Sequence, residues 1–215
     1  SGDHGIPGMP RAKCNLYDIG CDVALAASWP GIISPGRVID DFVNLMDLAP
    51  TFCEAGGIDI PDKMRAKSLL PILLSEESGK IDRDRNFVVT GRERHMVSAR
   101  DQFLPYPQRA IRVENYIYIF NFEPDRWPMG DPKDLEEIPT KTYDYRTLLY
   151  DFTIAPFQDM DPSPTKAWMI NHREDEDIEP LYHLSFGKRP QEELYDLRKD
   201  PDYMNNVAMD PLYQE

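Results

Sequence analysis

The sequence predicts a mixed α/β protein, in which the tail of a mixed-sheet domain is followed by a small antiparallel α+β domain. The continuous apolar run at residues 23–28 is typical of a strand that is buried on both faces of a sheet, and residues 86–90 are a second candidate for such a strand. Further along, residues 109–113 and 116–120 alternate in polarity on either side of a Glu114-Asn115 turn. Such alternation around a short turn indicates an antiparallel hairpin.

This change of pattern predicts a domain boundary. We expect residues 1–104 to form the C-terminal part of an α/β domain, and residues 105–215 to form the antiparallel sheet with its helices. No internal repeat and no low-complexity tract interrupts either part.

Helices are expected in both parts. Residues 47–55 have Asp47 as a candidate N-cap, Pro50 in the first turn, and Gly56 as a stop signal. The remaining predicted elements are short helices at residues 68–74, 141–152 and 164–172, and a final strand at residues 193–197.

The charge of the chain excludes some functions. The chain has 24 Lys and Arg residues against 38 Asp and Glu residues, which gives a formal net charge of −14. Such a surface repels nucleic acid and anionic membranes on average, so we set nucleic-acid binding aside. No segment reaches the ~20 apolar residues of a membrane span. An anion site must therefore be a local group of basic side chains within an acidic surface.

The three cysteines are Cys14, Cys21 and Cys53, an odd number that cannot pair fully within the chain. Their spacing matches no zinc motif. Buried free thiols are the simpler interpretation, because free cysteine is among the residue types most often buried. A disulfide between Cys14 and Cys21 is the alternative.

Several segments resemble sulfatases in their order and spacing. They are the Asp-His-Gly turn at residues 3–5, the basic stretch leading to Tyr and Gly at residues 11–20, Trp-Pro-Gly at residues 29–31, the predicted helix with its glycines at residues 47–58, and the C-terminal segment at residues 193–208. Together they cover nearly the whole chain. Residues 91–95, 109–112 and 125–128 are most similar to the heparan N-sulfatase branch (sulfamidase, N-sulfoglucosamine sulfohydrolase).

The resemblance implies the alkaline-phosphatase-like fold and the hydrolysis of sulfate ester or N-sulfate groups of a sulfated carbohydrate, such as N-sulfoglucosamine in heparan sulfate. It also implies Ca²⁺ and a formylglycine nucleophile, made from Cys or Ser in a Cys/Ser-x-Pro/Ala-x-Arg motif. No cysteine or serine of this chain lies in such a motif. We therefore expect the nucleophile in a preceding segment, and no turnover by this chain alone.

The resemblance assigns a metal-binding role to Asp3 and His4. A carboxylate suits Ca²⁺, which takes 6–8 oxygen ligands, whereas an Asx-turn is the purely structural interpretation of Asp3. Many relatives have Asn at the position of His4, and imidazole is a poor calcium ligand. His4 is therefore expected to bind the metal weakly, or to donate to the sulfate or leaving group. Asp-His-Gly is also similar to the zinc-binding turn of phosphoesterases in the same superfamily.

Lys13 matches the family position that binds sulfate and assists the leaving group, because compact positive charge stabilises the negative charge that develops there. Arg94 and His95 follow the predicted strand at residues 86–90, and ligand sites in α/β sheets lie beyond such strand ends. We expect both to bind sulfate or carboxylate groups of the sugar. A solvated Lys13, and pairing of Arg94 with Glu93, are the structural alternatives.

Three functions thus stay open: a sulfatase, a metal-dependent phosphoesterase of the same superfamily, and a non-catalytic carbohydrate-binding or structural module. Sulfatases are usually exported, so we expect a periplasmic or secreted protein. The first domain enters in the middle of a sheet, which should expose apolar edges. We expect self-association, or contact with the missing N-terminal segment, to cover them.

Overall fold

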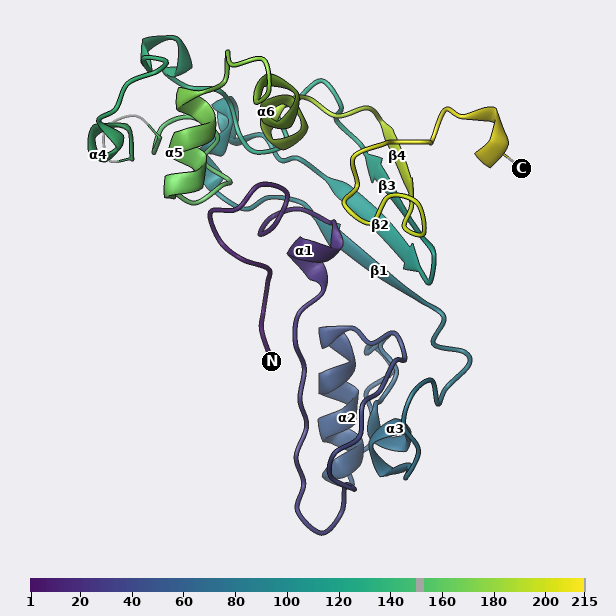
Figure 1. The fold of residues 1–215 in the computed structure, drawn as a ribbon. Coiled ribbons are helices and arrows are strands. Elements are labelled where there is room, and N and C mark those ends of the chain that lie inside the picture. Colours follow the sequence, from purple (N-terminus) through teal and green to yellow (C-terminus); the bar gives the residue numbers. More distant parts are fainter. Residues whose placement is uncertain (150–152, 215) are drawn as a thin grey trace. The chain divides into compact units, whose positions relative to one another are not determined.

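The computed structural model describes residues 1–149 and 153–214, and the chain divides into two compact units (Figure 1). Unit 1 comprises Ser1, Ala24–Val88 and Arg112–Glu114, and unit 2 comprises Gly2–Val23, Val89–Ile111 and Asn115–Glu215. The predicted boundary after residue 104 stays a prediction. The mixed α and β composition is confirmed.

Unit 1 contains the predicted helices α2 (Leu48–Ala55) and α3 (Leu70–Leu74). The short 3-10 helix η1 (Leu45–Asp47) runs directly into α2, and Asn44 caps η1 by accepting a hydrogen bond from the Met46 N–H at 3.1 Å. Asp47 does not cap α2 as predicted; its carboxylate instead accepts from the Asn44 N–H at 3.0 Å and closes the capping box of η1.

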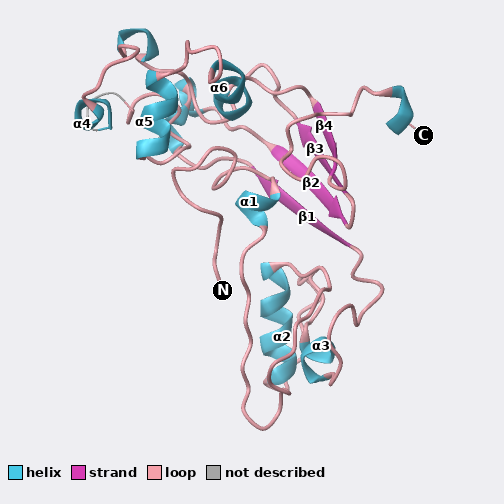
Figure 2. Ribbon diagram, viewed as in Figure 1, coloured by secondary structure: helices cyan, strands magenta, loops and turns pink. Residues whose placement is uncertain are grey.

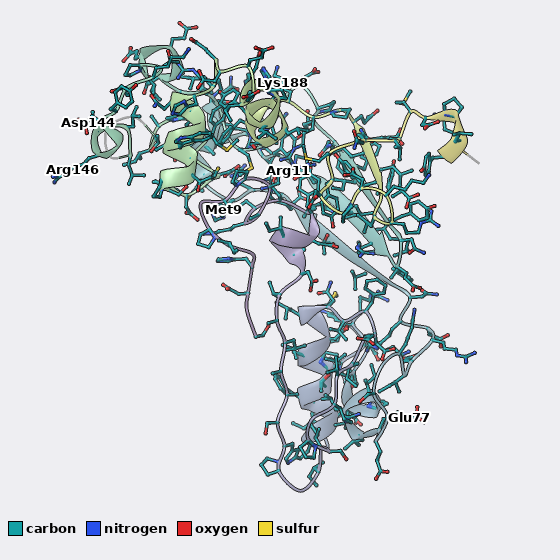
Figure 3. All side chains as sticks on the ribbon, in the orientation of Figure 1. Met9, Arg11, Glu77, Asp144, Arg146 and Lys188 are labelled. Atoms are coloured by element: carbon teal, nitrogen blue, oxygen red, sulfur yellow. The ribbon has the colours of Figure 1, made fainter. Side chains whose placement is uncertain are left out.

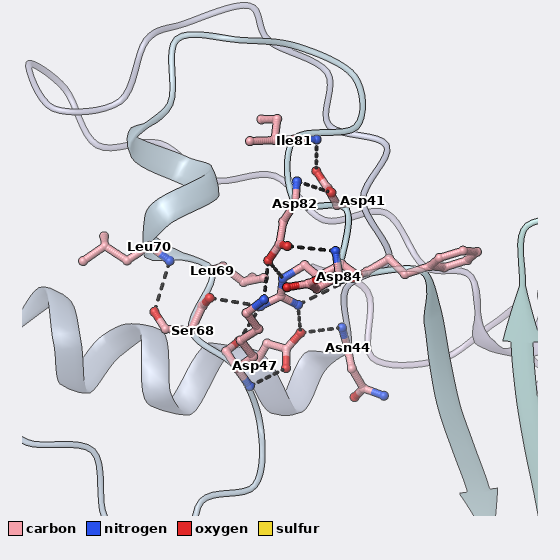
Figure 4. Close-up of polar contacts among 12 residues, drawn as sticks. Asp41, Asn44, Asp47, Ser68, Leu69, Leu70, Ile81, Asp82 and Asp84 are labelled. Carbon is pink, nitrogen blue, oxygen red and sulfur yellow. Dashed lines mark hydrogen bonds and ion pairs between the residues drawn. The ribbon is translucent and has the colours of Figure 1, made fainter.

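A polar network around Arg85 holds unit 1 together (Figure 4). Arg85 Nη1 lies 2.7 Å from Asp47 Oδ2, and Nη2 donates to the carbonyl oxygens of Lys67 and Ser68 at 2.7 and 3.0 Å. Buried apolar side chains are fewer here than in unit 2, which contains both hydrophobic clusters of the described residues. The hydrogen bonds of Arg85 therefore connect three stretches of unit 1, which has few buried apolar side chains.

The apolar run at residues 23–28 is not a strand, so this prediction was wrong. The described strands all belong to one sheet, and none of them includes this run. Residues 24–30 are exposed and have no regular secondary structure. An apolar run becomes a strand only where another strand accepts its backbone hydrogen bonds, and no described strand does so here.

The sheet has the order β1-β2-β3-β4 and lies mainly in unit 2 (Figure 2). Its strands are β1 (Phe87–Arg92), β2 (Gln108–Val113), β3 (Tyr116–Asn121) and β4 (Glu192–Asp196). The predicted hairpin is confirmed as β2 and β3, and the predicted final strand as β4. Strands β3 and β4 pair antiparallel, with Tyr116 opposite Asp196 and Phe120 opposite Glu192.

Strand β1 was predicted to be buried on both faces, which is wrong. It lies at one edge of the sheet, and its side chains alternate in exposure, with Phe87 50% and Val89 51% exposed. One face of the sheet is covered, because Ile117 and Ile119 of β3 are buried in a cluster with Tyr17 and Tyr195. The alternation of β3 therefore follows the period of two that separates the faces of a strand.

Unit 2 also contains α1 (Asp18–Cys21), α4 (Tyr145–Thr147), α5 (Pro164–Asn171) and α6 (Glu179–Phe186). The predicted helix at residues 164–172 is confirmed as α5. Of the predicted helix at residues 141–152, α4 covers three residues, and residues 150–152 lie outside the described residues. Among the described residues of unit 2, the 3-10 helices are η2 (Val97–Ala99), η3 (Asp101–Phe103), η4 (Leu135–Glu137) and η6 (Pro211–Tyr213).

The second cluster of unit 2 is formed by α5, α6 and the loop before them. Phe157 stacks on Phe186 with ring centroids 4.6 Å apart, and Ile170 of α5 is buried with them. This cluster fixes the segment from Phe157 to the start of α5.

None of the helices in the described part of the chain is both long enough and apolar enough to cross a membrane.

Candidate functional site

Two glycines fix the loop that carries Asp3, His4 and Lys13. The Gly5 N–H donates to the Gly20 carbonyl at 3.0 Å. A Cβ atom on Gly5 would lie 2.0 Å from the Ile19 carbonyl oxygen, and one on Gly20 would lie 2.5 Å from the Ala12 carbonyl oxygen. Both positions therefore need glycine, because two stretches of backbone approach each other there. The Asp-His-Gly turn is docked on α1 in this way.

Arg11 anchors the middle of the same loop, which Met9 and Arg11 mark in Figure 3. Its guanidinium lies 3.8 Å from the centroid of the Tyr17 ring, donates to the Tyr195 hydroxyl at 3.1 Å, and also donates to the Tyr203 carbonyl. Arg11 therefore makes its hydrogen bonds and ring contacts with the hydrophobic cluster that contains Tyr17 and Tyr195. Lys13 is the other basic residue of this loop, and we expect it to be the one that binds an anion.

Lys13 forms an ion pair that the sequence did not predict. Its Nζ atom donates to Asp161 Oδ2 at 2.9 Å, and the two side chains are 20% and 39% exposed. The hydrogen bond to Asp161 raises the pKa of Lys13, and the charge of the nearby Asp3 contributes in the same direction. The Lys13 ammonium group is therefore protonated and is held in place by Asp161. It donates one N–H to Asp161 and keeps further N–H groups for other acceptors.

Asp3 and His4 lie at the start of the loop. The Asp3 carboxylate is 88% exposed and lies 3.7 Å from His4 Nε2. Nδ1 of His4 lies 2.8 Å from the Gly5 carbonyl oxygen, which can only accept, so this hydrogen bond requires a proton on Nδ1.

An exposed carboxylate fits the role of one ligand of a hard cation. In residues 1–149 and 153–214, no three His, Cys, Asp or Glu side chains form a group that could hold a metal ion. Asp3, with His4 beside it, thus fits as a part of a larger ligand set.

Arg94 and His95 lie on the exposed loop that follows β1. Neither makes a hydrogen bond or ion pair within the part of the chain that the structure describes. Glu93, the alternative partner of Arg94, instead pairs with Arg109. Both side chains are therefore available to a ligand, and their role in binding sugar stays a prediction.

The segment at residues 159–161, which we call the acidic segment, connects the loop of Lys13 with the loop of Arg94 and His95. Asp159 is almost fully buried; its Oδ1 accepts from the Met96 N–H at 2.8 Å and its Oδ2 from Arg100 at 2.8 Å. Two residues later, Asp161 accepts from Lys13. The loop of Arg94 and His95 and the loop of Lys13 are thus bonded to the same short segment.

Buried Lys166 fixes this acidic segment. Its Nζ donates to the carbonyl oxygens of Phe157 and Met160 at 3.0 and 2.9 Å, and burial lowers the pKa of Lys166 to about 8. The Ser163 hydroxyl then donates to the Gly8 carbonyl at 2.5 Å. The segment is therefore bound to α5 on one side and to the loop of Lys13 on the other.

Arg92 also fixes the backbone of the Lys13 loop. It is buried, donates to the carbonyl oxygens of Cys14 and Pro128, and has its pKa lowered by burial to about 10. Because Cys14 follows Lys13 directly, Arg92 fixes the backbone next to that lysine.

Comparison with known proteins defines the class, because the relatives are sulfatases. The chain is 28% identical over 214 residues to an ulvan-active sulfatase from Formosa agariphila, covering 100% of the chain and 33% of that protein. It is 25% identical over 235 residues to N-sulphoglucosamine sulphohydrolase from Homo sapiens, covering 99% and 37%. Among solved structures, BT4656 in complex with its substrate D-glucosamine-2-N,6-O-disulfate aligns with a TM-score of 0.39 and 17% identity, over 78% of the chain and 20% of that chain.

The chain belongs to the family described as N-sulphoglucosamine sulphohydrolase, C-terminal, whose model matches residues 10–149. The resemblance predicted from the motifs is thereby confirmed. Lys13, Arg94 and His95 lie within the matched residues, whereas Asp3, His4 and Asp161 lie outside them. The chain spans about a third of the length of these two curated relatives.

Proposed function

We propose that the protein to which this chain belongs is a sulfatase that hydrolyses sulfate ester or N-sulfate groups of a sulfated carbohydrate, such as N-sulfoglucosamine. Membership of the N-sulphoglucosamine sulphohydrolase C-terminal family supports the class. The observation that carries the proposal is Lys13, a protonated ammonium group that Asp161 holds at 2.9 Å beside the Asp-His-Gly turn.

Each residue of the site has a role in this proposal. Lys13 binds a sulfate oxygen and stabilises the negative charge that develops as the bond from sulfur to the leaving oxygen or nitrogen breaks. Asp3 is one carboxylate ligand of a Ca²⁺ ion, and His4 binds the ion weakly or donates to the leaving group. Arg94 and His95 bind anionic groups of the sugar.

Two components of the proposed site are not residues of this chain. A bound Ca²⁺ ion would supply positive charge at the sulfate oxygens. A formylglycine from a Cys/Ser-x-Pro/Ala-x-Arg motif would supply the nucleophile. We further propose that the whole protein is exported to the periplasm or secreted, as is usual for sulfatases.

One observation favours a second function, a zinc-dependent phosphoesterase of the same superfamily. The bond from Nδ1 to the Gly5 carbonyl directs Nε2 away from that carbonyl, and Nε2 is the atom that a Zn²⁺ ion would bind once it carries a lone pair. Elemental analysis of the whole protein separates the two proposals, because the sulfatase should contain calcium and the phosphoesterase zinc.

Activity of the whole protein tests the proposal directly. We expect hydrolysis of N-sulfoglucosamine or of an O-sulfated glucosamine, and a fall in kcat of roughly 100-fold or more in Lys13→Ala, as for other lost transition-state donors. Lys63→Ala is the matched control, because Lys63 is exposed and lies in unit 1. Wild-type activity in Lys13→Ala, or phosphate ester hydrolysis without sulfate release, would overturn the proposal.

A further inference from the structure

We propose that Asp161 is a positioning residue for Lys13, which it holds in place to receive a sulfate group. This inference rests on the proposed function, since it assigns the role of Asp161 through Lys13. The two residues lie 148 positions apart in sequence, yet Lys13 Nζ and Asp161 Oδ2 are 2.9 Å apart. Asp161 lies outside the residues that the family model matches.

The first argument is that the backbone just before Asp161 is fixed by hydrogen bonds and by packing. The Phe157 and Met160 carbonyl oxygens, just before Asp161, both accept from the buried Nζ of Lys166 at 3.0 and 2.9 Å. Phe157 is itself fully buried and stacked on Phe186. The position of the Asp161 backbone is therefore set by the core of unit 2.

The second argument is that the loop of Lys13 is hydrogen-bonded to the segment that contains Asp161. Ser163 caps α5 by accepting from the Lys166 N–H at 3.0 Å, and its hydroxyl donates to the Gly8 carbonyl at 2.5 Å. A Cβ atom on Gly8 would lie 2.6 Å from the Ser163 Cβ, so the two backbones are in close contact. The backbones of Asp161 and Lys13 are thus fixed relative to each other within unit 2.

The third argument concerns the side chain of Lys13. A lysine has a flexible four-carbon stem, so an unheld ammonium group samples many positions. A single hydrogen bond to Asp161 restricts this motion and still leaves N–H donors for a sulfate oxygen. Binding then requires less ordering of the side chain, and the charge sits in the same place in the transition state.

An alternative effect of Asp161 is that it weakens sulfate binding by neutralising Lys13. The two effects predict opposite results for Asp161→Asn in the whole protein. If Asp161 positions Lys13, kcat falls by up to about 100-fold, as expected for a displaced group at the reacting centre. If Asp161 only neutralises Lys13, KM falls and kcat is unchanged, and this result would overturn the inference.

The experiment compares wild type, Asp161→Asn, Asp161→Glu and Asp161→Ser in the whole protein, with Asp177→Asn as control because Asp177 is exposed in the same unit. We expect Asp161→Glu to retain more activity than Asp161→Asn or Asp161→Ser, since it keeps the carboxylate, and Asp177→Asn to match wild type. Asp161→Ser replaces Asp161→Asn if the latter does not fold. Equal activity in wild type, Asp161→Asn and Asp161→Ser would also overturn the inference.

A second readout does not depend on turnover. Asp161 raises the pKa of Lys13, so Asp161→Asn should lower that pKa and move the alkaline loss of activity to lower pH. NMR of the whole protein labelled with [13C]lysine measures this pKa, and Lys13→Arg assigns the signal. An unchanged pKa, with Lys13→Ala still inactive, would overturn the inference and leave the proposed function standing.

Failure of the proposed function gives a different result. In that case the wild-type protein hydrolyses no sulfated sugar, or Lys13→Ala keeps full activity. Either outcome overturns the role of Asp161 in sulfate binding, even if the pKa of Lys13 falls in Asp161→Asn.

Discussion

The Arg85 guanidinium and the Asp47 carboxylate form a buried ion pair, with Nη1 and Oδ2 2.7 Å apart and side chains 6% and 8% exposed. Figure 4 shows the polar contacts around Asp47. Arg85 joins three stretches of unit 1, because it also donates to the Lys67 and Ser68 carbonyls. Asp47 in turn stands at the start of α2. The pair therefore connects the helix to the chain that packs beside it.

Replacing Arg85 with methionine should destabilise unit 1 strongly. The variant leaves the Asp47 carboxylate buried without its partner, and such a loss costs about 3–5 kcal/mol. Hydrogen exchange of the amides in α2 measures the effect, and these amides should exchange faster. Arg83→Met is the control, because Arg83 is exposed, and its effect should stay within about 0.5 kcal/mol.

The double variant Asp47→Asn with Arg85→Met tests the reason for this loss. It removes the buried charge as well as its partner, so exchange in α2 should be slower than in Arg85→Met alone. Equal exchange in the two variants would show that the hydrogen bonds of Arg85 to backbone carbonyls, rather than the charge on Asp47, account for the loss.

The fold could be predicted from the sequence where the signal is local. Helix α2 and the hairpin of β2 and β3 follow from turn residues and periodicity within a dozen positions. The run at residues 23–28 misled the prediction, because apolar composition indicates a tendency to be buried and does not identify a partner strand. The same reason explains the edge position of β1, since strand order is a property of the whole sheet.

The candidate site could be predicted only in part. Lys13 was identified from the family resemblance, and no local pattern pairs it with a carboxylate 148 positions away. The buried Lys166 was also missed, because lysine is almost never fully buried unless it is paired. Its hydrogen-bond partners, the Phe157 and Met160 carbonyls, depend on a turn that the sequence does not indicate.

Lys166 predicts an unusual dependence of stability on pH. Burial lowers its pKa from the ordinary 10.5 to about 8. Between these values the unfolded chain holds a proton on Lys166 that the folded chain has lost, so the free energy of unfolding rises with pH. Below pH about 8 the cost of burying the charge is fully present.

Urea denaturation of wild type and Lys166→Met at pH 7, 8, 9 and 10 isolates this contribution. From pH 8 upward the stability difference should shift toward wild type, by at most about 1.4 kcal/mol per pH unit. The corresponding difference for Lys63→Met should not change, because Lys63 is exposed. A pH-independent difference for Lys166→Met would contradict the prediction.

Cys14 and Cys21 should react slowly in the folded protein. All three are free, so the simpler interpretation of the sequence is confirmed over a Cys14–Cys21 disulfide, although each thiol is only partly buried. Burial raises the pKa of Cys14 and of Cys21 from 9.0 to about 11. The reactive thiolate is therefore about 100-fold rarer at pH 8 than in an exposed cysteine.

Mass spectrometry of iodoacetamide-treated protein checks this prediction at each cysteine. The peptides of Cys14 and Cys21 should be alkylated much more slowly in the native protein than in urea. Comparable rates in both states would contradict the raised pKa values. Cys53, on α2 in unit 1, is the internal comparison within the same sample.

The glycines of the Asp-His-Gly loop predict a last effect, on stability and activity together. Gly5→Ala places a Cβ atom 2.0 Å from the Ile19 carbonyl oxygen, so the turn must move away from α1. Such overpacking costs about 1–3 kcal/mol. If Asp3 and His4 are ligands of Ca²⁺, as proposed, the affinity of the whole protein for Ca²⁺ should fall as well. Gly2→Ala is the control, since its Cβ meets only the Val23 side chain, at 3.3 Å. Calcium titration by calorimetry and a thermal melt should show a lower calcium affinity and a lower melting temperature in Gly5→Ala, and neither change in Gly2→Ala. A lower melting temperature with unchanged calcium affinity would contradict the proposal that Asp3 and His4 bind the metal.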